Sequence, residues 1–108
     1  MEMVNRFDIY LLNLDAEISE DAKNTRPCVV ISPDEMNRHI STAIVAPISS
    51  TDQKYPTRIP FDFLEKKRSV VLDQLRTVEK ARLVKNIGKL DNRTQASILE
   101  TLQEMFTK

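Results

Sequence analysis

Residues 23–32 read KNTRPCVVIS and pass from a polar loop into an apolar, β-branched run. Pro27 has a fixed φ and no backbone N–H donor, so it suits the first residue of a strand. It also restricts Arg26 to extended backbone dihedrals. The stretch therefore predicts a strand over residues 27–31 with one arginine held at its entrance.

Arg26 allows two interpretations. A guanidinium on stiff backbone at the rim of a sheet is suited to bind phosphate, because it offers a planar fork of N–H donors. An ordinary loop arginine before an ordinary strand would have the same local sequence. The choice between them depends on the rest of the chain.

The chain has 108 residues and 41% hydrophobic content, so we expect one domain over residues 1–108 with one core. A chain this small often completes its burial by pairing with a copy of itself, which favours a homodimer. Cys28 is the one cysteine, and its apolar surroundings indicate a buried thiol in a reducing compartment, with a reactive thiol as the alternative.

No secretory signal is visible at the start of the sequence, and the longest apolar run, residues 43–48, is too short to cross a bilayer. These features predict a soluble, cytoplasmic protein with no membrane contact.

Charge is unevenly distributed along a chain whose net charge is zero. Residues 1–53 carry four basic and nine acidic side chains, whereas residues 54–93 carry eleven basic and five acidic ones. A basic segment on a neutral protein can line one groove for an anionic partner, although scattered surface lysines would give the same count.

The hydrophobic pattern predicts a mainly β fold with two helices. The expected strands are residues 7–14, 27–31, 41–48, 57–61, 69–73, 75–78 and 83–90, and 69–78 could form one bent strand. Pro60 indicates an edge strand, and residues 49–56 and 65–68 read as turns. Short strands with tight connections and a closing helix suggest a small, partly open barrel.

Helix signals occur twice. Ser32 as cap, Pro33 at the first position and Glu35 as capping-box partner predict a short helix that ends near Arg38 or His39. A second helix, from Asn92 onward with Asp91 or Asn92 as cap, carries apolar residues at helical spacing.

The sequence lacks the residues that several classes of catalytic site require. One histidine and one cysteine do not supply the usual zinc spacings, no nucleophile elbow accompanies His39, and no glycine-rich phosphate loop is present. His39 reads as a surface or cap residue. What remains is chemistry by arginine, carboxylates and hydroxyls, such as RNA cleavage through the RNA's own 2′-hydroxyl, which needs no metal or other cofactor.

Four segments together resemble the MazF/PemK family of toxin endoribonucleases from bacterial toxin–antitoxin modules. The resemblance runs in order through DIYLLNLD at 8–15, TRPCVVIS at 25–32, AIVAPISS at 43–50 and VVLDQLRTV at 70–78. It implies an SH3-like, CcdB/MazF-type partly open barrel with a short inserted helix and a C-terminal helix.

The family resemblance also implies function. It implies metal-independent, sequence-selective cleavage of single-stranded mRNA to 2′,3′-cyclic phosphate and 5′-hydroxyl ends, by a homodimer whose interface shapes the RNA groove. It further implies neutralisation by a MazE-like antitoxin with an acidic, flexible tail, which would suit the basic segment.

Transferred residue by residue, the resemblance makes Arg26 the catalytic arginine and Ser49 a hydrogen-bond donor to the scissile phosphate. Asp73, Gln74 and Arg76 match a segment that contributes to catalysis or RNA contact, with Asp73 assigned to catalysis. Arg76 could instead form a structural ion pair with Asp73 or Glu79. The further expected RNA contacts are Lys23, Asn24, Thr25, Ser50, Lys54 and Tyr55.

The first loop departs from the family pattern. Relatives commonly have Gly-Ser-Glu or Gly-His-Glu where this chain has Ser19-Glu20-Asp21. Glu20 and Asp21 are therefore the candidates for the general base, and solvated loop acids are the alternative.

Two other classes of function compete with the ribonuclease. One is a non-catalytic CcdB-like toxin that binds DNA gyrase, and the other is a small RNA-binding or partner-binding barrel. Residues 25–27 and 73–76 argue against the gyrase binder, since such a binder has no need to place a cation in a groove. The second class stays open, and a cleavage activity that is lost in Arg26→Ala would exclude it.

Overall fold

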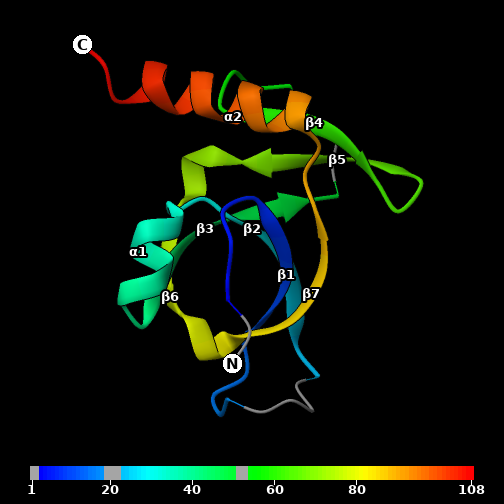
Figure 1. Cartoon of the computed structure of the whole chain (residues 1–108). Coiled ribbons are helices and arrows are strands. Elements are labelled where there is room, and N and C mark those ends of the chain that lie inside the picture. The colour runs from blue at the N-terminus through cyan, green and yellow to red at the C-terminus, as the bar shows by residue number, and fades with distance from the viewer. Residues whose placement is uncertain (1–2, 19–22, 51–53) are drawn as a thin grey trace.

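The computed structural model describes residues 3–18, 23–50 and 54–108, and within these ranges the chain forms a curved sheet, two α-helices and two 3₁₀ turns (Figure 1). The elements are β1 (Asp8–Asn13), β2 (Thr25–Val30), α1 (Asp34–His39), β3 (Thr42–Ser49), β4 (Arg58–Phe63), β5 (Lys66–Val71), η1 (Leu72–Gln74), β6 (Arg76–Glu79), η2 (Lys80–Arg82), β7 (Leu83–Lys89) and α2 (Asn92–Met105).

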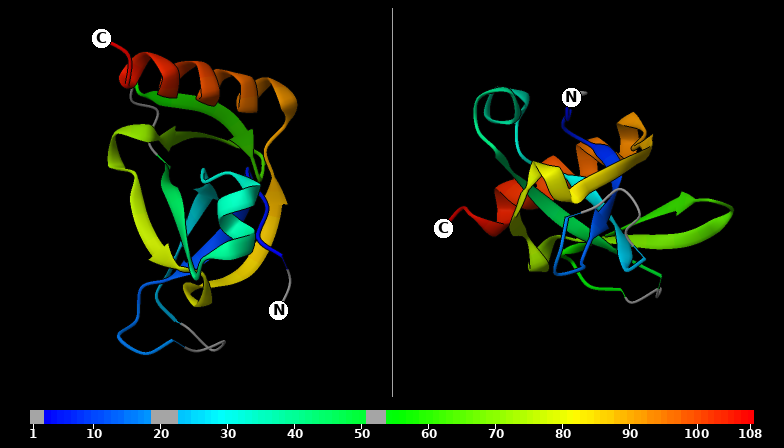
Figure 2. Two further views of the ribbon diagram at one scale, coloured as in Figure 1. Left: turned by 60° about the vertical axis from the view of Figure 1, so that its left-hand side comes forward. Right: turned by 90° about the horizontal axis from the view of Figure 1, so that it is seen from below.

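The strands form one antiparallel sheet in the order β4-β5-β3-β2-β1-β7. One edge of β3 is shared: its first half pairs with β6, as Val45 does with Arg76, and its end pairs with β5, as Ile48 does with Val70. The segment predicted as two short strands or one bent strand over 69–78 thus follows one edge of β3, with a bend at η1 between β5 and β6. The sheet curls into the partly open barrel that the sequence predicted, and α2 lies across one side of it, beside β4 (Figure 2).

Alternation along β2 divides the interior into two cores. Val29 belongs to the core that α2 covers, together with Ile98 of that helix. Cys28 and Val30 point to the opposite face and pack with Leu12 and Val45 in a second core inside the barrel. Because successive side chains of a strand alternate in direction, one continuous apolar run supplies both cores.

The C-terminal helix begins as predicted. Asp91 is its N-cap and accepts a hydrogen bond from the Thr94 backbone N–H at 2.7 Å. That bond holds the pKa of the Asp91 carboxyl below its ordinary value. Of the two predicted caps, the structure uses Asp91 and not Asn92.

The predicted capping box of the short helix is wrong. Pro33 is the N-cap of α1 and makes no side-chain cap hydrogen bond. The buried Ser32 hydroxyl instead donates to Asn37 Oδ1 at 2.6 Å and accepts from the Ile44 backbone N–H at 3.0 Å. A tertiary partner has therefore replaced the local one, although α1 still ends at His39, where the sequence placed its end.

The turn predicted at residues 65–68 is also wrong in position. The β4–β5 hairpin turns at Leu64 and Glu65, whose φ angles are 53° and 64°, and residues 66–68 belong to β5. Positive φ at both central residues gives the twist that suits a two-residue hairpin, usually with Asn or Gly. Pro60 lies in β4 at the edge of the sheet, so the edge prediction is confirmed.

In the described part of the chain, no helix combines the length and apolar character needed to cross a membrane.

Replacement of Ile98 tests the α2-side core. Ile98 is 0% exposed, so Ile98→Ala should lower the free energy of unfolding by about 2–5 kcal/mol in a urea titration, because it leaves a cavity. The neighbouring Leu99 is 41% exposed, and Leu99→Ala should change it by less than about 1 kcal/mol. Equal effects would contradict the assigned helix face.

Candidate active site

The register of the sheet brings two arginines to one concave face. Arg26 of β2 lies opposite Leu12 of β1, and Arg76 of β6 lies opposite Val45 of β3. Leu12 and Val45 belong to the core inside the barrel, and residues opposite each other in a sheet share a face. Arg26 and Arg76 therefore stand at the rim of that same core.

A pocket of about 250 Å³ opens between these two arginines. Its walls are mostly apolar, and its polar side chains are the two guanidiniums and the amide of Gln74. The residues that line it are Leu12, Leu14, Arg26, Pro27, Cys28, Val45, Pro47, Gln74 and Arg76. Three of the predicted site residues, distant in sequence, thus meet at one cavity.

Both arginines are available for a ligand. Each is exposed, and within residues 3–18, 23–50 and 54–108 neither guanidinium forms a hydrogen bond or an ion pair. The alternative in which Arg76 pairs with Asp73 or Glu79 is not what the structure forms. Two like charges without a counterion at one cavity favour an anionic ligand there.

Ser49 is the last residue of β3 and pairs with Ser69 of β5. The β2–β3 ladder ends with Cys28 opposite Pro47, and Ser49 does not line the pocket. Ser50 follows at the exposed end of β3. A hydroxyl and a guanidinium on neighbouring strands are suited to hold different oxygens of one phosphate.

Asp73 lies in η1 but is not among the side chains that line the pocket. Its carboxylate accepts a hydrogen bond from the Thr57 hydroxyl at 2.9 Å and lies 3.5 Å from Arg58 Nε. Together, the Thr57 hydrogen bond and the Arg58 charge hold the pKa of the exposed Asp73 carboxyl below its ordinary value. In this arrangement Asp73 fastens the start of β4 to η1.

Of the residues predicted to contact RNA, Lys23, Asn24 and Thr25 directly precede Arg26, and none of them lines the pocket. Asn24 and Thr25 continue directly into Arg26, and the Lys23 backbone N–H donates to Asp15 Oδ2 at 3.1 Å. Glu20 and Asp21, the candidate general bases, lie outside the described residues.

Lys54 and Tyr55, from the loop that precedes β4, are exposed. The Arg58 guanidinium lies 5.0 Å from the centre of the Tyr55 ring, so one face of that ring is already stacked. Neither residue lines the pocket.

Cys28 is a pocket residue that the sequence analysis assigned only to the core. It is 1% exposed, and burial raises the pKa of its thiol to about 12. The signal that would have identified it is alternation, since Arg26 and Cys28 are two apart on one strand.

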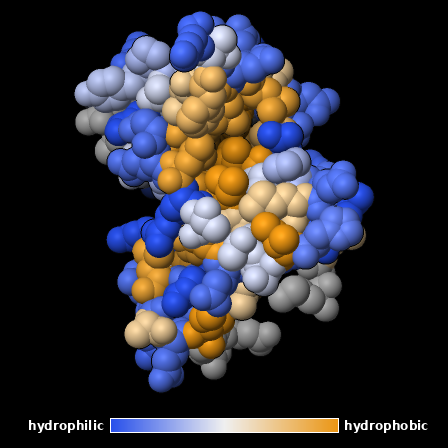
Figure 3. Space-filling view, turned by 90° about the vertical axis from the view of Figure 1, so that its left-hand side faces the viewer, coloured by the Kyte–Doolittle hydropathy of each residue, from blue (hydrophilic) through white to orange (hydrophobic). Residues whose placement is uncertain are grey.

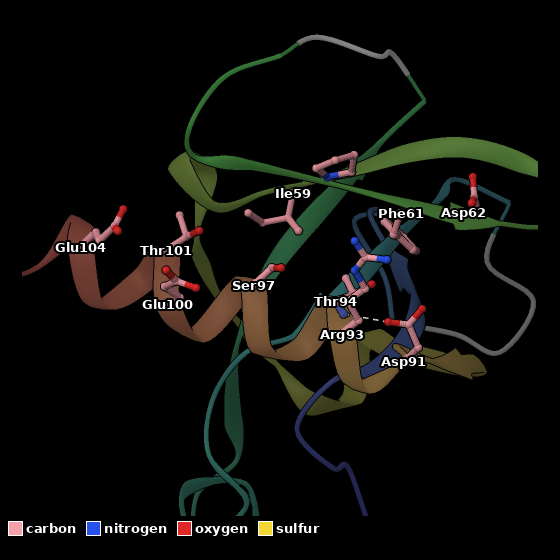
Figure 4. A pocket seen from close by; sticks show the side chains of 11 residues that line it. Ile59, Phe61, Asp62, Asp91, Arg93, Thr94, Ser97, Glu100, Thr101 and Glu104 are labelled. Atoms are coloured by element: carbon pink, nitrogen blue, oxygen red, sulfur yellow. Dashed lines mark hydrogen bonds between the residues drawn. The ribbon is translucent and has the colours of Figure 1, made fainter.

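A larger cavity of about 580 Å³ lies between β4 and α2 (Figure 4). Its carboxylates are Asp62, Asp91, Glu100 and Glu104, and Arg93 is its one cation. This excess of negative charge disfavours an anionic ligand, and none of the predicted site residues lines the cavity.

The described residues include no group of three or more His, Cys, Asp or Glu side chains that could hold a metal ion.

Comparison with known proteins agrees with this geometry. The fold superposes on the toxin MazF-mt6 of Mycobacterium tuberculosis with a TM-score of 0.76, at 24% identity over 92% of this chain and 95% of that one. It superposes on a MazE–MazF structure from Deinococcus radiodurans with a TM-score of 0.78, at 18% identity over 97% of this chain and 96% of that one. The structure is therefore a MazF-type barrel.

Comparison of the sequence identifies the family in addition to the fold. It is 35% identical to endoribonuclease EndoA of Bacillus subtilis over an alignment 107 residues long that covers 94% of this chain and 92% of that protein. The sequence model of the PemK-like, MazF-like toxins of type II toxin–antitoxin systems matches residues 5–106. The chain belongs to this toxin family, and its endoribonuclease relative confirms the predicted class of enzyme.

Alkylation tests the environment assigned to Cys28. A thiol pKa of about 12 in place of 9.0 lowers the thiolate fraction at pH 8 about a thousandfold, and the thiolate is the nucleophile. Iodoacetamide should therefore label the native protein at least about a thousandfold more slowly than the urea-unfolded protein. Similar rates in both states would contradict a buried, protonated thiol.

Proposed function

We propose that this chain is the toxin of a toxin–antitoxin pair and cleaves single-stranded mRNA at the pocket between Arg26 and Arg76. The observation that carries the proposal is a pair of guanidiniums above an apolar pocket, neither of which has a side-chain partner among the described residues. A nucleotide has the matching parts, because its phosphate attracts the cations and its base can pack on apolar walls.

The proposed reaction transfers a phosphoryl group within the RNA. The 2′-oxygen attacks the neighbouring phosphorus, the bond to the 5′-oxygen breaks, and the products are a 2′,3′-cyclic phosphate and a 5′-hydroxyl. One group takes the proton from the 2′-hydroxyl, and another supplies a proton to the departing 5′-oxygen. The RNA provides its own nucleophile, so this scheme calls for no metal or cofactor.

In this scheme Arg26 stabilises the negative charge that develops on the phosphoryl oxygens and donates the proton to the leaving group. Ser49, at the end of the neighbouring strand β3, is proposed to donate a hydrogen bond to the same phosphate. Glu20 and Asp21 are the proposed general bases. Asp73 supports the site through Thr57 and Arg58, and does not touch the reacting atoms in this scheme.

Gln74 and Arg76 face Arg26 across the pocket and are proposed to hold the nucleotide next to the cut. Lys23, Asn24, Thr25, Ser50, Lys54 and Tyr55 are proposed to extend this contact along the strand. Phosphate contacts by these cations predict binding that weakens as salt increases.

A homodimer is proposed from the apolar face at the C-terminal end of α2. Leu102 and Met105 are half-buried there, Phe106 is 75% exposed, and Leu75 of the η1–β6 connection packs in the same core cluster. Figure 3 shows apolar side chains gathered on this side of the molecule. Uncovered apolar area of this kind is typical of an interface.

The antitoxin is proposed to be a MazE-like protein whose acidic tail competes with RNA for the two arginines. One solved structure with this fold is an endoribonuclease from Mycobacterial species in complex with its cognate antitoxin. We place the toxin in the cytoplasm, where its mRNA substrate is found.

A cleavage assay on a long single-stranded RNA in excess EDTA tests the proposed function. The wild type should make discrete cuts that end in 2′,3′-cyclic phosphate. Arg26→Ala should lower the cleavage rate by about 10²–10³, the usual loss when one preorganised donor to the transition state is removed. Arg26→Lys should remain well below wild type, because an ammonium lacks the planar fork.

Arg93→Ala is the matched control, since Arg93 lies on α2 in the acidic cavity, and it should cleave like wild type. Intact RNA with folded wild-type protein would contradict the proposal and direct attention to gyrase or another binding partner. Cleavage that survives Arg26→Ala would contradict the assigned site.

Sedimentation tests the dimer face. Phe106→Glu should weaken dimerisation about tenfold or more, because it would bury an unpaired charge at the interface. Leu64→Glu is the control, since Leu64 is 67% exposed at the distant β4–β5 turn and should leave dimerisation unchanged. A dimer that tolerates Phe106→Glu would contradict this face.

A further inference from the structure

The start of the loop between β1 and β2 is organised by a buried amide. Asn13, the last residue of β1, is 0% exposed. Its Oδ1 accepts from the Asp15 backbone N–H at 2.7 Å, and its Nδ2 donates to the Glu17 carbonyl at 3.2 Å. The side chain thus directs the first turn of the loop as the chain leaves the sheet.

A cation from a distant segment holds the same turn. Arg82 of η2 donates through Nη1 to the Asn13 carbonyl at 3.1 Å and to the Asp15 carbonyl at 2.8 Å. These carbonyls flank Leu14, so the guanidinium clamps the backbone on both sides of that residue. Hydrogen bonds from a charged donor are stronger than those between neutral groups.

η2 itself is fixed from its other end. Lys80 donates its backbone N–H to the Ser41 carbonyl at 2.8 Å and its Nζ to the Asn37 carbonyl at 2.5 Å. The turn that carries Arg82 is therefore anchored to the end of α1 and the start of β3. A clamp on such an anchored element transmits little motion to the loop it holds.

The clamped residue belongs to the candidate active site. Leu14 lines the pocket with Arg26, and its backbone N–H donates to the Asn24 carbonyl at 2.8 Å. The Lys23 N–H to Asp15 Oδ2 bond then ties the returning end of the loop to its start. Arg26 lies two residues after Asn24.

We propose that Arg82, acting with Asn13, is a positioning residue that sets the place of Leu14 and Arg26 at the pocket. Arg82 does not line the pocket and does not contact RNA in this account, which rests on the proposed ribonuclease function. Its role follows from geometry: a displacement of about 1 Å at a reacting group can cost about 10²-fold in rate.

The test compares Arg82→Ala, Arg82→Lys and wild type by steady-state cleavage kinetics and by amide hydrogen exchange. Arg82→Ala should lower kcat by about 10- to 100-fold with KM changed less than about threefold. The amides of Leu14, Asp15 and Lys23 should lose protection, while those of Val29 and Ile98 keep it. Arg82→Lys should recover part of kcat, because an ammonium can still reach a carbonyl.

Lys85→Ala is the control, since it removes an exposed cation from neighbouring β7 and should change neither readout. Unchanged kcat in Arg82→Ala, or unchanged exchange at Leu14 and Asp15, would overturn the proposal. Loss of protection throughout the protein would overturn it as well, because Arg82 would then serve stability alone. If wild type cleaves no RNA, the proposed function fails, and the exchange data still decide whether the clamp exists.

Discussion

The pairing of β2 with β1 on one side and β3 on the other is the constraint on which the site depends. Its ladders set Arg26 opposite Leu12 and Cys28 opposite Pro47, so one strand carries a catalytic candidate and the pocket wall behind it. A slip of one residue would turn Arg26 toward the α2-covered core and Val29 toward the pocket. The apolar run after Pro27 disfavours that slip, because its alternate side chains pack in the two cores and would exchange places.

Positive and negative side chains gather on different sides of the molecule. The concave face presents Arg26 and Arg76 without counterions among the described residues, whereas the cavity between β4 and α2 presents an excess of carboxylates. A neutral chain thereby separates a surface that attracts polyanions from one that repels them. This division in space does not follow the uneven charge along the sequence, because Arg26 comes from the acidic segment 1–53, whereas Asp62 and Asp91 come from the basic segment 54–93.

Much of the fold could be predicted from local signals, and the errors have physical causes. The edge at Pro60 and the Asp91 cap follow from backbone chemistry, whereas β2 begins at Thr25, two residues before the start predicted at Pro27, and so includes Arg26. The hairpin turn at Leu64 and Glu65 was misplaced because neither residue is typical of positive φ, and Ser32 bonds Asn37 of α1 and the more distant Ile44 in place of the predicted cap. Local rules fail where a tertiary partner competes.

The candidate site, like the fold, could be predicted only in part from the sequence. Similarity to the toxin family placed Arg26, Gln74 and Arg76 among the site residues, and the structure brings them to one pocket. The apolar walls and the Arg82 clamp depend on strand register and on contacts across 67 or more residues, which no local pattern contains.

The most direct measurement of the central claim is an NMR titration of the wild type with a 2′-deoxy single-stranded oligonucleotide, which lacks the nucleophile and is not cleaved. The account predicts that the largest amide shifts map to Leu14, Arg26, Cys28, Gln74 and Arg76, and that they shrink as salt increases. Shifts centred on the acidic cavity between β4 and α2, with these amides unmoved, would contradict it.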